Sequence, residues 1–209
     1  GFLLAACTVG VMLSGCGSRE TAFSPSESCV YVAKDGALSS ALVEQTGGIS
    51  VDENELKQYL ETAVIHFNEE KGAGALAQNQ KNAERLPAAL KSVKAGKDTV
   101  TAIFDYASLE DLKAFGETHD NEDTSNSLTA LEAKPLSEAI ADGWFSEGEL
   151  VKADGSEAGT DTVQNEKSGM AVRSEGGATL MVGGKVLCRS SNTELKDDST
   201  VSLPETGTA

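Results

Sequence analysis

The stretch CVYVAKDGALSSALVE, residues 29–44, decides the fold. Apolar and polar residues alternate on both sides of Lys34-Asp35-Gly36, and a period of two is typical of half-buried strands. Asp-Gly between two such runs is a strong signal for a hairpin, because both residues tolerate the positive φ of the favoured turn. The sequence therefore predicts two antiparallel strands joined at this turn.

A helix is predicted directly after this hairpin. Asp52, with Glu55 three residues later, has the pattern of an N-terminal cap and its partner. Apolar side chains then recur at helical spacing on one predicted face, which comprises Leu56, Tyr59, Leu60, Ala63, Val64 and Phe67. The pattern stops at Gly72.

More strands and helices are expected further along. Residues 86–108 indicate a second hairpin that turns at residues 95–98, and Ser108-x-x-Asp111 opens a short helix. A third, very short helix is predicted from Ser137 to Asp142, where Gly143 ends it. The remaining tail returns to strand character, with turns at glycine and aspartate pairs.

This order of elements predicts an α+β fold. We expect a mainly antiparallel sheet built from hairpins, with two or three short helices packed on one face. The predicted organisation is an α+β domain at residues 29–145 and a polar, Gly-rich linker or loop at 146–167. A C-terminal β region at 168–209 is expected to be part of the same domain.

The charge balance narrows the classes of partner. The chain has 209 residues and a formal net charge of −16 at pH 7. Such an acidic protein repels phosphate groups, which argues against nucleic acid and against electrostatic attachment to an anionic membrane surface. The composition suits a soluble, exported domain.

The first fifteen residues carry no charged side chain and are largely apolar. Their length fits the apolar region of a signal peptide and falls short of the roughly 20 residues that a helix needs to span a bilayer. A signal peptide also begins with Met and a basic segment. Since neither precedes this run, we expect the chain to start inside a longer reading frame.

The run ends in Leu13-Ser14-Gly15-Cys16, which resembles the lipobox of bacterial lipoproteins. The resemblance implies a diacylglyceryl group on the sulfur of Cys16 and cleavage just before it, because the thiol is the good nucleophile available for alkylation. Residues 1–15 would then be the signal peptide, and residues 16–28 a lipidated cysteine with a polar linker. This arrangement predicts a protein anchored by lipid on the extracytoplasmic face of the cell membrane. The alternative is a chance cysteine after an apolar run.

A wider resemblance covers most of the chain. The segments VYVAKDGALSSALVE, DENELKQYLETAV and GGKVLCRSSNTELKDDSTVSL are similar to a group of membrane-anchored lipoproteins of Gram-positive anaerobes. The resemblance includes no catalytic motif, so it implies a location and no chemistry.

Two of the four cysteines could form a disulfide with each other. Of the four cysteines, Cys7 lies in the predicted signal and Cys16 is the predicted lipid site. Cys29 and Cys188 both lie in strand-like stretches, which we expect to be neighbouring strands, and two thiols in an exported protein can form a disulfide. The alternative is two separate buried thiols.

No motif predicts a cofactor or a metal site. His66 and His119 lack a second ligand at metal-binding spacing, and no G-x-S-x-G motif supports a catalytic serine. The acidic stretches DNEDTSN and DGSEAGTD do not match a calcium loop. The aromatic pair Trp144-Phe145 suits either a binding platform or the core, and we predict that Trp144 is buried.

The segment Leu203-Pro204-Glu205-Thr206-Gly207 resembles the sortase signal that links proteins to peptidoglycan. That signal requires an apolar stretch and basic residues behind it, and Thr208 and Ala209 alone follow in this sequence. We interpret the match as a strand that runs into a turn. Attachment by sortase would require a longer reading frame.

These observations favour a lipid-anchored, extracytoplasmic protein with a non-catalytic role in binding or envelope interaction. Its protein or small-molecule partner is unknown from the sequence. One alternative is an anchored hydrolase with an unrecognised carboxylate site, for which close carboxylates with raised pKa values would be evidence. A second alternative is a sortase-attached wall protein.

Overall fold

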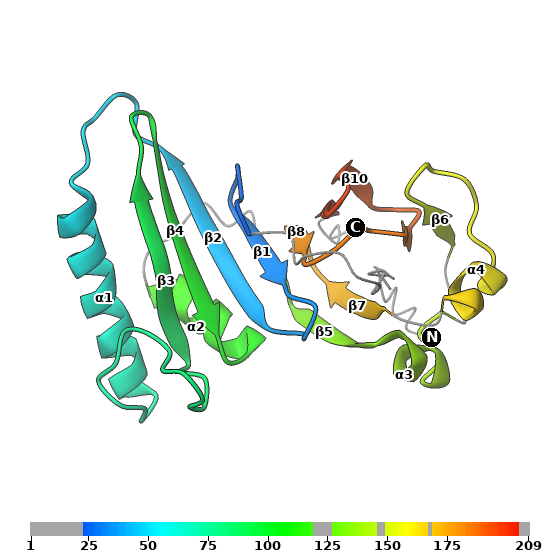
Figure 1. Cartoon of the computed structure of the whole chain (residues 1–209), viewed down its shortest axis with the longest axis horizontal. Helices are drawn as coiled ribbons and strands as arrows, with labels where there is room; N and C mark the ends of the chain where they lie inside the picture. Colours follow the sequence, from blue (N-terminus) through cyan, green and yellow to red (C-terminus); the bar gives the residue numbers. More distant parts are fainter. Residues whose placement is uncertain (1–22, 119–126, 146–148, 167–168, 205–209) are drawn as a thin grey trace, which may run out of the picture. The chain divides into compact units, whose positions relative to one another are not determined.

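The structure is a computed structural model and describes residues 23–118, 127–145, 149–166 and 169–204. The predicted α+β fold is confirmed: the described residues form a mainly antiparallel mixed sheet of seven strands, two smaller sheets and four helices (Figure 1). The strand order of the large sheet is β10-β11-β8-β1-β2-β4-β3.

The chain divides into two compact units. The first comprises Ser24–Tyr31 and the described part of Ala37–Thr124. The second comprises Phe23, Val32–Gly36 and the described part of Ser125–Ala209.

The first hairpin forms where the sequence predicts it. Strand β1 (Cys29–Val32) leads into β2 (Leu38–Gln45), and Gly36 in the turn has a φ of +82°. The amide of Gly36 donates to the carbonyl of Ala33 at 2.9 Å. The Asp-Gly pattern therefore acts through a backbone conformation that glycine adopts without strain.

Helix α1 (Glu53–Glu70) begins at the predicted cap. The carboxylate of Asp52 accepts hydrogen bonds from the amides of Asn54 and Glu55, at 2.8 and 3.0 Å. The prediction that Tyr59 belongs to the apolar face is wrong, since its side chain is 66% exposed. Successive residues turn by about 100°, so Tyr59 lies about 140° around the helix from the buried Val64.

The second hairpin and helix also form as predicted. Strands β3 (Ala88–Ala95) and β4 (Thr99–Tyr106) pair antiparallel, with a bulge between Leu90 and Ser92. Strand β4 also pairs along its whole length with β2. Helix α2 (Leu109–Thr118) begins at Ser108, whose hydroxyl accepts from the Asp111 amide at 3.1 Å.

Aromatic rings form the core of the first unit. Phe115 of α2 lies 5.2 Å from both Phe67 of α1 and Phe104 of β4, measured between ring centroids, and 6.0 Å from Tyr106. All four side chains are buried. The two helices and β4 therefore meet at the ring of Phe115. Each aromatic pair stabilises the fold by about 0.5–1.5 kcal/mol beyond the contribution of its buried area.

Asn68 is a fully buried polar side chain near the end of α1. Its Nδ2 donates to the carbonyls of Leu76 and Ala88 at 2.9 and 2.8 Å, and its Oδ1 accepts from the Ala88 amide at 3.0 Å. One side chain thus fixes the helix, the connection that follows it and the start of β3. Because its amide is fully paired, burial does not leave it unsatisfied.

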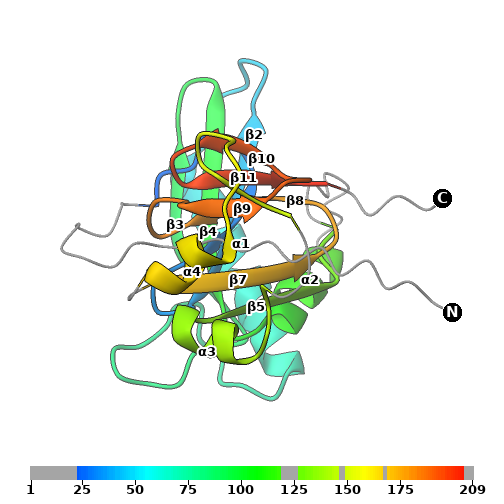
Figure 2. The ribbon, with the colours of Figure 1, turned by 90° about the vertical axis from the view of Figure 1, so that its right-hand side faces the viewer.

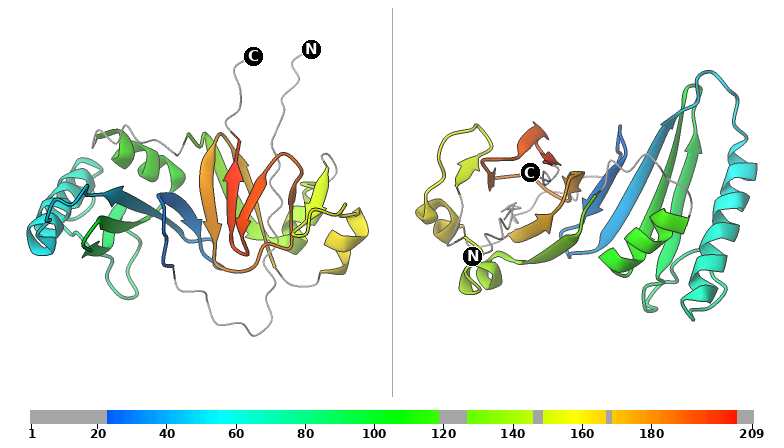
Figure 3. Two further views of the ribbon diagram at one scale, coloured as in Figure 1. Left: turned by 90° about the horizontal axis from the view of Figure 1, so that it is seen from above. Right: turned by 180° about the vertical axis from the view of Figure 1, so that it is seen from behind.

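The second unit contains short strands and helices. Strand β5 pairs with β7, and α3 contacts both (Figure 2). Strand β8 pairs with β11, which pairs with β10 (left view of Figure 3). The elements are β5 (Ala130–Pro135), α3 (Leu136–Ala141), β6 (Leu150–Lys152), α4 (Thr160–Asn165), β7 (Met170–Glu175), β8 (Ala178–Val182), β9 (Cys188–Ser190), β10 (Glu194–Asp197) and β11 (Thr200–Leu203).

Two sequence expectations in this unit have different outcomes. The short third helix is present as α3, and Gly143 follows it with a φ of +73°. The region that we expected to be a linker or loop, residues 146–167, instead contributes strand β6 and helix α4. Strand β6 forms because it pairs with β9, about forty residues later in the chain, and local polar composition does not reveal such a partner.

Gly176 makes a close approach that requires glycine. It follows β7 with a φ of +89°, and a Cβ at this position would overlap the carbonyl of Ser127. Two hydrogen bonds join the adjacent Gly177 to Ser127. The Ser127 amide donates to the Gly177 carbonyl at 2.7 Å, and the Gly177 amide donates to the Ser127 hydroxyl at 3.0 Å. These bonds prevent the two segments from separating to admit a side chain.

Replacing Asn68→Ala should lower the free energy of unfolding by about 3 kcal/mol, because the amide and carbonyl of Ala88 would stay buried without the Asn68 side chain and the part-buried Leu76 carbonyl would lose its bond to it. Urea unfolding followed by circular dichroism measures the change. Asn54→Ala, on the exposed side of the same helix, is the matched control and should change it by less than about 0.5 kcal/mol. Equal effects of the two substitutions would contradict the role given to Asn68.

Replacing Gly176→Ala should destabilise the protein more than Gly155→Ala. Both glycines have positive φ, at +89° and +84°, but Gly155 has open space around it. Backbone strain alone should cost about 1 kcal/mol at Gly155, and the overlap with Ser127 should add about 2 kcal/mol at Gly176. Thermal unfolding of the two variants tests the difference, and equal melting temperatures would refute the close approach.

Candidate functional site

Several predicted site residues lie outside the described part of the chain. They are the lipidation residue Cys16 with its signal, His119, and Glu205, Thr206 and Gly207 of the sortase-like motif. Their roles stay predictions. In the described part, no helix combines the length and the apolar composition needed to cross a membrane.

The start of the sortase-like motif is part of the sheet. Leu203 is the last residue of β11, pairs with Ala178 of β8 and is 5% exposed. Pro204 follows directly. A peptidase that binds this motif in extended form would first have to separate the end of β11 from β8, which agrees with our interpretation of the match as a strand that runs into a turn.

The expectation that Cys29 and Cys188 lie on neighbouring strands is wrong. Strand β1, with Cys29, lies between β8 and β2, whereas β9, with Cys188, pairs with β6 in a different sheet. Both cysteines are buried, and neither is in a disulfide. Burial raises the pKa of the Cys188 thiol above its ordinary value, which disfavours the reactive thiolate.

Trp144 is buried, as predicted, with 6% of its surface exposed. It packs in a cluster with Leu136, Ala139, Val163, Ala171 and Cys188. The ammonium of Lys134 and the guanidinium of Arg173 lie 4.4 and 4.6 Å from the ring centroid. Because its own chain covers the ring, Trp144 is a core residue and not an open binding platform.

The two cations over Trp144 belong to a network of ion pairs. Lys134 lies 2.7 Å from a carboxylate oxygen of Asp142 and 3.1 Å from one of Glu132, and Arg173 lies 2.9 Å from Glu132. The hydrogen bond with Asp142 is the main cause that raises the pKa of Lys134 above its ordinary value. The network matches each cation to a carboxylate, so we interpret it as support for the β5–β7 pair.

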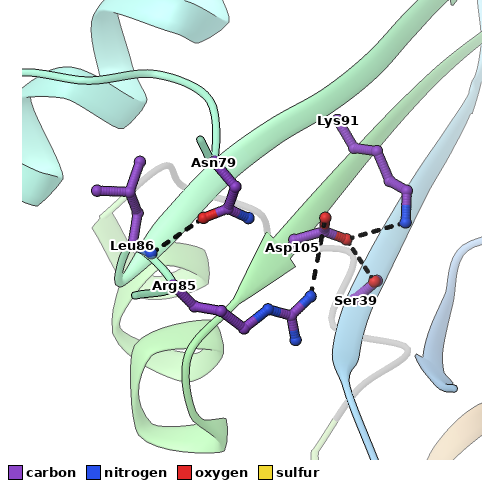
Figure 4. Close-up of polar contacts among 6 residues, drawn as sticks. All are labelled: Ser39, Asn79, Arg85, Leu86, Lys91 and Asp105. Atoms are coloured by element: carbon purple, nitrogen blue, oxygen red, sulfur yellow. Dashed lines mark hydrogen bonds and ion pairs between the residues drawn. The ribbon is translucent and has the colours of Figure 1, made fainter. Parts of the chain in front are cut away.

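The most concentrated polar cluster in the first unit surrounds Asp105 of β4 (Figure 4). Its Oδ1 accepts a hydrogen bond from the hydroxyl of Ser39 at 2.6 Å and one from the ammonium of Lys91 at 3.3 Å. The guanidinium of Arg85 lies 3.9 Å from Oδ2. The Asp105 side chain is 13% exposed, so these partners compensate most of its lost hydration.

The neighbouring pair of residues shows the alternation of the strand. Ser39 and Asp105 are paired across β2 and β4, and the next pair, Ser40 and Phe104, points to the other face. On that face the hydroxyls of Ser40 and Tyr106 lie 3.1 Å apart. Burial raises the pKa of Tyr106 well above its ordinary value, which keeps its hydroxyl neutral.

The Asp105 cluster was not found from the sequence. Its position in the alternating run Phe104-Asp105-Tyr106 does indicate that Asp105 lies on the face opposite the aromatic core. Its partner Ser39 is 66 residues away and occurs in an unremarkable Ser-Ser pair. The register of β2 against β4 creates the cluster, and no local pattern reveals that register.

The described carboxylates and histidine offer little for catalysis or metal binding. His66 is exposed on α1, with its Nε2 3.3 Å from Glu70. Among the described residues, no three His, Cys, Asp or Glu side chains are grouped so that they could hold a metal ion. Hydrogen bonds from Ser156 lower the pKa of Asp154, and hydrogen bonds from Ser199 and Thr200 outweigh burial and lower that of Asp197.

Comparisons of this chain with protein-family models, with curated protein sequences and with solved structures find no match. Its function is therefore inferred from its own residues.

The two described cysteines should behave as separate, shielded thiols. In a chain with Cys7→Ala and Cys16→Ala, the intact mass should show no disulfide, and Ellman's reagent should react slowly until urea unfolds the protein. Unfolding should then release two thiols per chain. A mass lower by about two hydrogens, or rapid reaction of the folded protein, would contradict the two buried thiols.

Proposed function

We propose that this chain is a lipid-anchored extracytoplasmic protein with a non-catalytic role in binding or envelope interaction. The observation that carries the proposal is the spacing of Leu13-Ser14-Gly15-Cys16 directly after an uncharged apolar run. That run is too short to hold a mature protein in a bilayer by itself. Stable attachment would come from covalent acyl chains, each buried methylene of which adds about 0.8 kcal/mol.

The polar face of the domain supports a binding role over a catalytic one. A general base needs a lone pair that is open to substrate. At Asp105, Ser39 and Lys91 occupy Oδ1 and the Arg85 guanidinium lies 3.9 Å from Oδ2, so two cations face this carboxylate. The lowered pKa values of Asp154 and Asp197 are also the reverse of what a carboxylic acid catalyst requires. Among the residues that the structure describes, the hydrolase alternative therefore has no specific residue in its favour.

The pairing of Leu203 in β11 supports the lipid as the anchor in preference to sortase. The predicted lipid site, Cys16, lies outside the described residues, which begin at Phe23. Binding of a sortase to a motif that begins at Leu203 would compete with the pairing of Leu203 with Ala178 of β8.

Replacing Cys16→Ala should abolish lipid attachment. The chain is expressed in a bacterium behind a start Met and a basic segment, and incorporation of labelled palmitate is measured. The original chain and the control Cys7→Ala should both take up label, because Cys7 lies within the apolar run and not in the lipobox. Replacing Cys16 should reduce incorporation to background.

Two outcomes would contradict the proposal. Equal labelling of all three chains would place the lipid elsewhere, and absence of label from the original chain would remove the anchor. Partition between detergent and aqueous phases provides a second readout, in which lipidated chains enter the detergent phase.

A further inference from the structure

Strand β3 is the last strand of the large sheet, so one of its sides faces no other strand of the described part of the chain. An edge strand presents backbone N–H and C=O groups that can pair with a strand of another chain. In this protein α1 runs alongside that edge (Figure 1 and the right view of Figure 3). Groups on and after α1 can therefore bond to the backbone of this edge.

The first half of the β3 edge is occupied by Asn68 and Ala77. The side-chain amide of Asn68 exchanges two hydrogen bonds with Ala88, one to its N–H at 3.0 Å and one to its C=O at 2.8 Å. An amide side chain carries the same donor and acceptor as a peptide group, so Asn68 takes the place of a neighbouring strand. Two residues on, the amide of Leu90 donates to the carbonyl of Ala77 at 2.8 Å.

The other end of the edge is occupied by a side chain of α1. Glu53, in the first turn, accepts a hydrogen bond from the Ala95 amide at 2.9 Å through its Oε2. Between the two ends lie the bulge at Leu90–Ser92 and the exposed side chains of Lys91 and Lys94. Bulges and lysines on edge strands both oppose pairing with another chain.

We propose that Asn68, Ala77 and Glu53 form an edge cover that prevents β3 from pairing with β3 of a second copy of this chain. The excluded partner follows from the sequence AALKSVKA of the strand. At the end of the edge that Glu53 covers, antiparallel self-pairing centred on Lys94 would place Val93 of each copy opposite Ala95 of the other. These apolar matches make an identical strand a good partner once the cover is removed.

The test opens the exposed end of the edge without touching the core. The uncovered variant of the full chain combines Glu53→Ala with Lys94→Thr, and the matched control combines Glu55→Ala with Lys97→Thr. All four side chains are exposed, and both variants lose one acidic and one basic residue. Every chain also carries Cys16→Ala, so that a lipid cannot drive association.

In the uncovered variant, we expect the Ala95 amide to exchange its hydrogen about tenfold faster than in the control. Sedimentation velocity should show concentration-dependent association of the uncovered variant while the control stays monomeric. A fluorescent peptide with the sequence of Ala88–Ala95 should bind the uncovered variant and not the control. Circular dichroism verifies that both variants are folded.

The proposal fails if the Ala95 amide exchanges at the same rate in both variants, because Glu53 would then not protect the edge. It also fails if exchange becomes faster while the uncovered variant neither associates nor binds the peptide. Equal association of the two variants would assign the effect to lost charge and would likewise overturn the edge cover.

Discussion

The first unit depends on the buried side chain of Asn68. Its hydrogen bonds join the end of α1, the connection that follows it and the first residue of β3. Helix α1 and β3 could otherwise be related by apolar packing alone, which is non-directional. The paired amide defines one register between helix and strand, because a shifted register would leave buried polar groups unsatisfied. Strand β4 and helix α2 then follow from the pairing of β3.

Elements with local signals were predicted from the sequence. The cap at Asp52, the turn at Gly36 and the helix start at Ser108 each depend on side chains within about three residues of one another. Their physical cause is therefore contained in the sequence window that was read. The burial of Trp144 was also predicted, since a chain with few aromatic residues uses them mainly in its core.

Features that arise from distant pairing were not predicted. The cluster at Asp105 depends on Ser39, and β6 depends on β9. Tyr59 was placed on the wrong side of α1 because apolar residues recur at helical spacing on the exposed side of this helix as well as on the buried side. The prediction that Cys29 and Cys188 lie on neighbouring strands was wrong because strand order is a property of the whole sheet, which local sequence does not reveal. Of the candidate site, the lipobox was predicted from local sequence, and it lies outside the described residues.

The lipid anchor and the folded domain are separable parts of this account. The domain is held together by β-sheet pairing and aromatic packing within the described residues, while the anchor depends on the chemistry of one cysteine before them. The most direct measurement is the mass of the N-terminal peptide of the protein isolated from bacterial membranes. The account predicts a peptide that begins at Cys16 and carries the added mass of a diacylglyceryl group. An unmodified Cys16, still joined to Gly15, would contradict it.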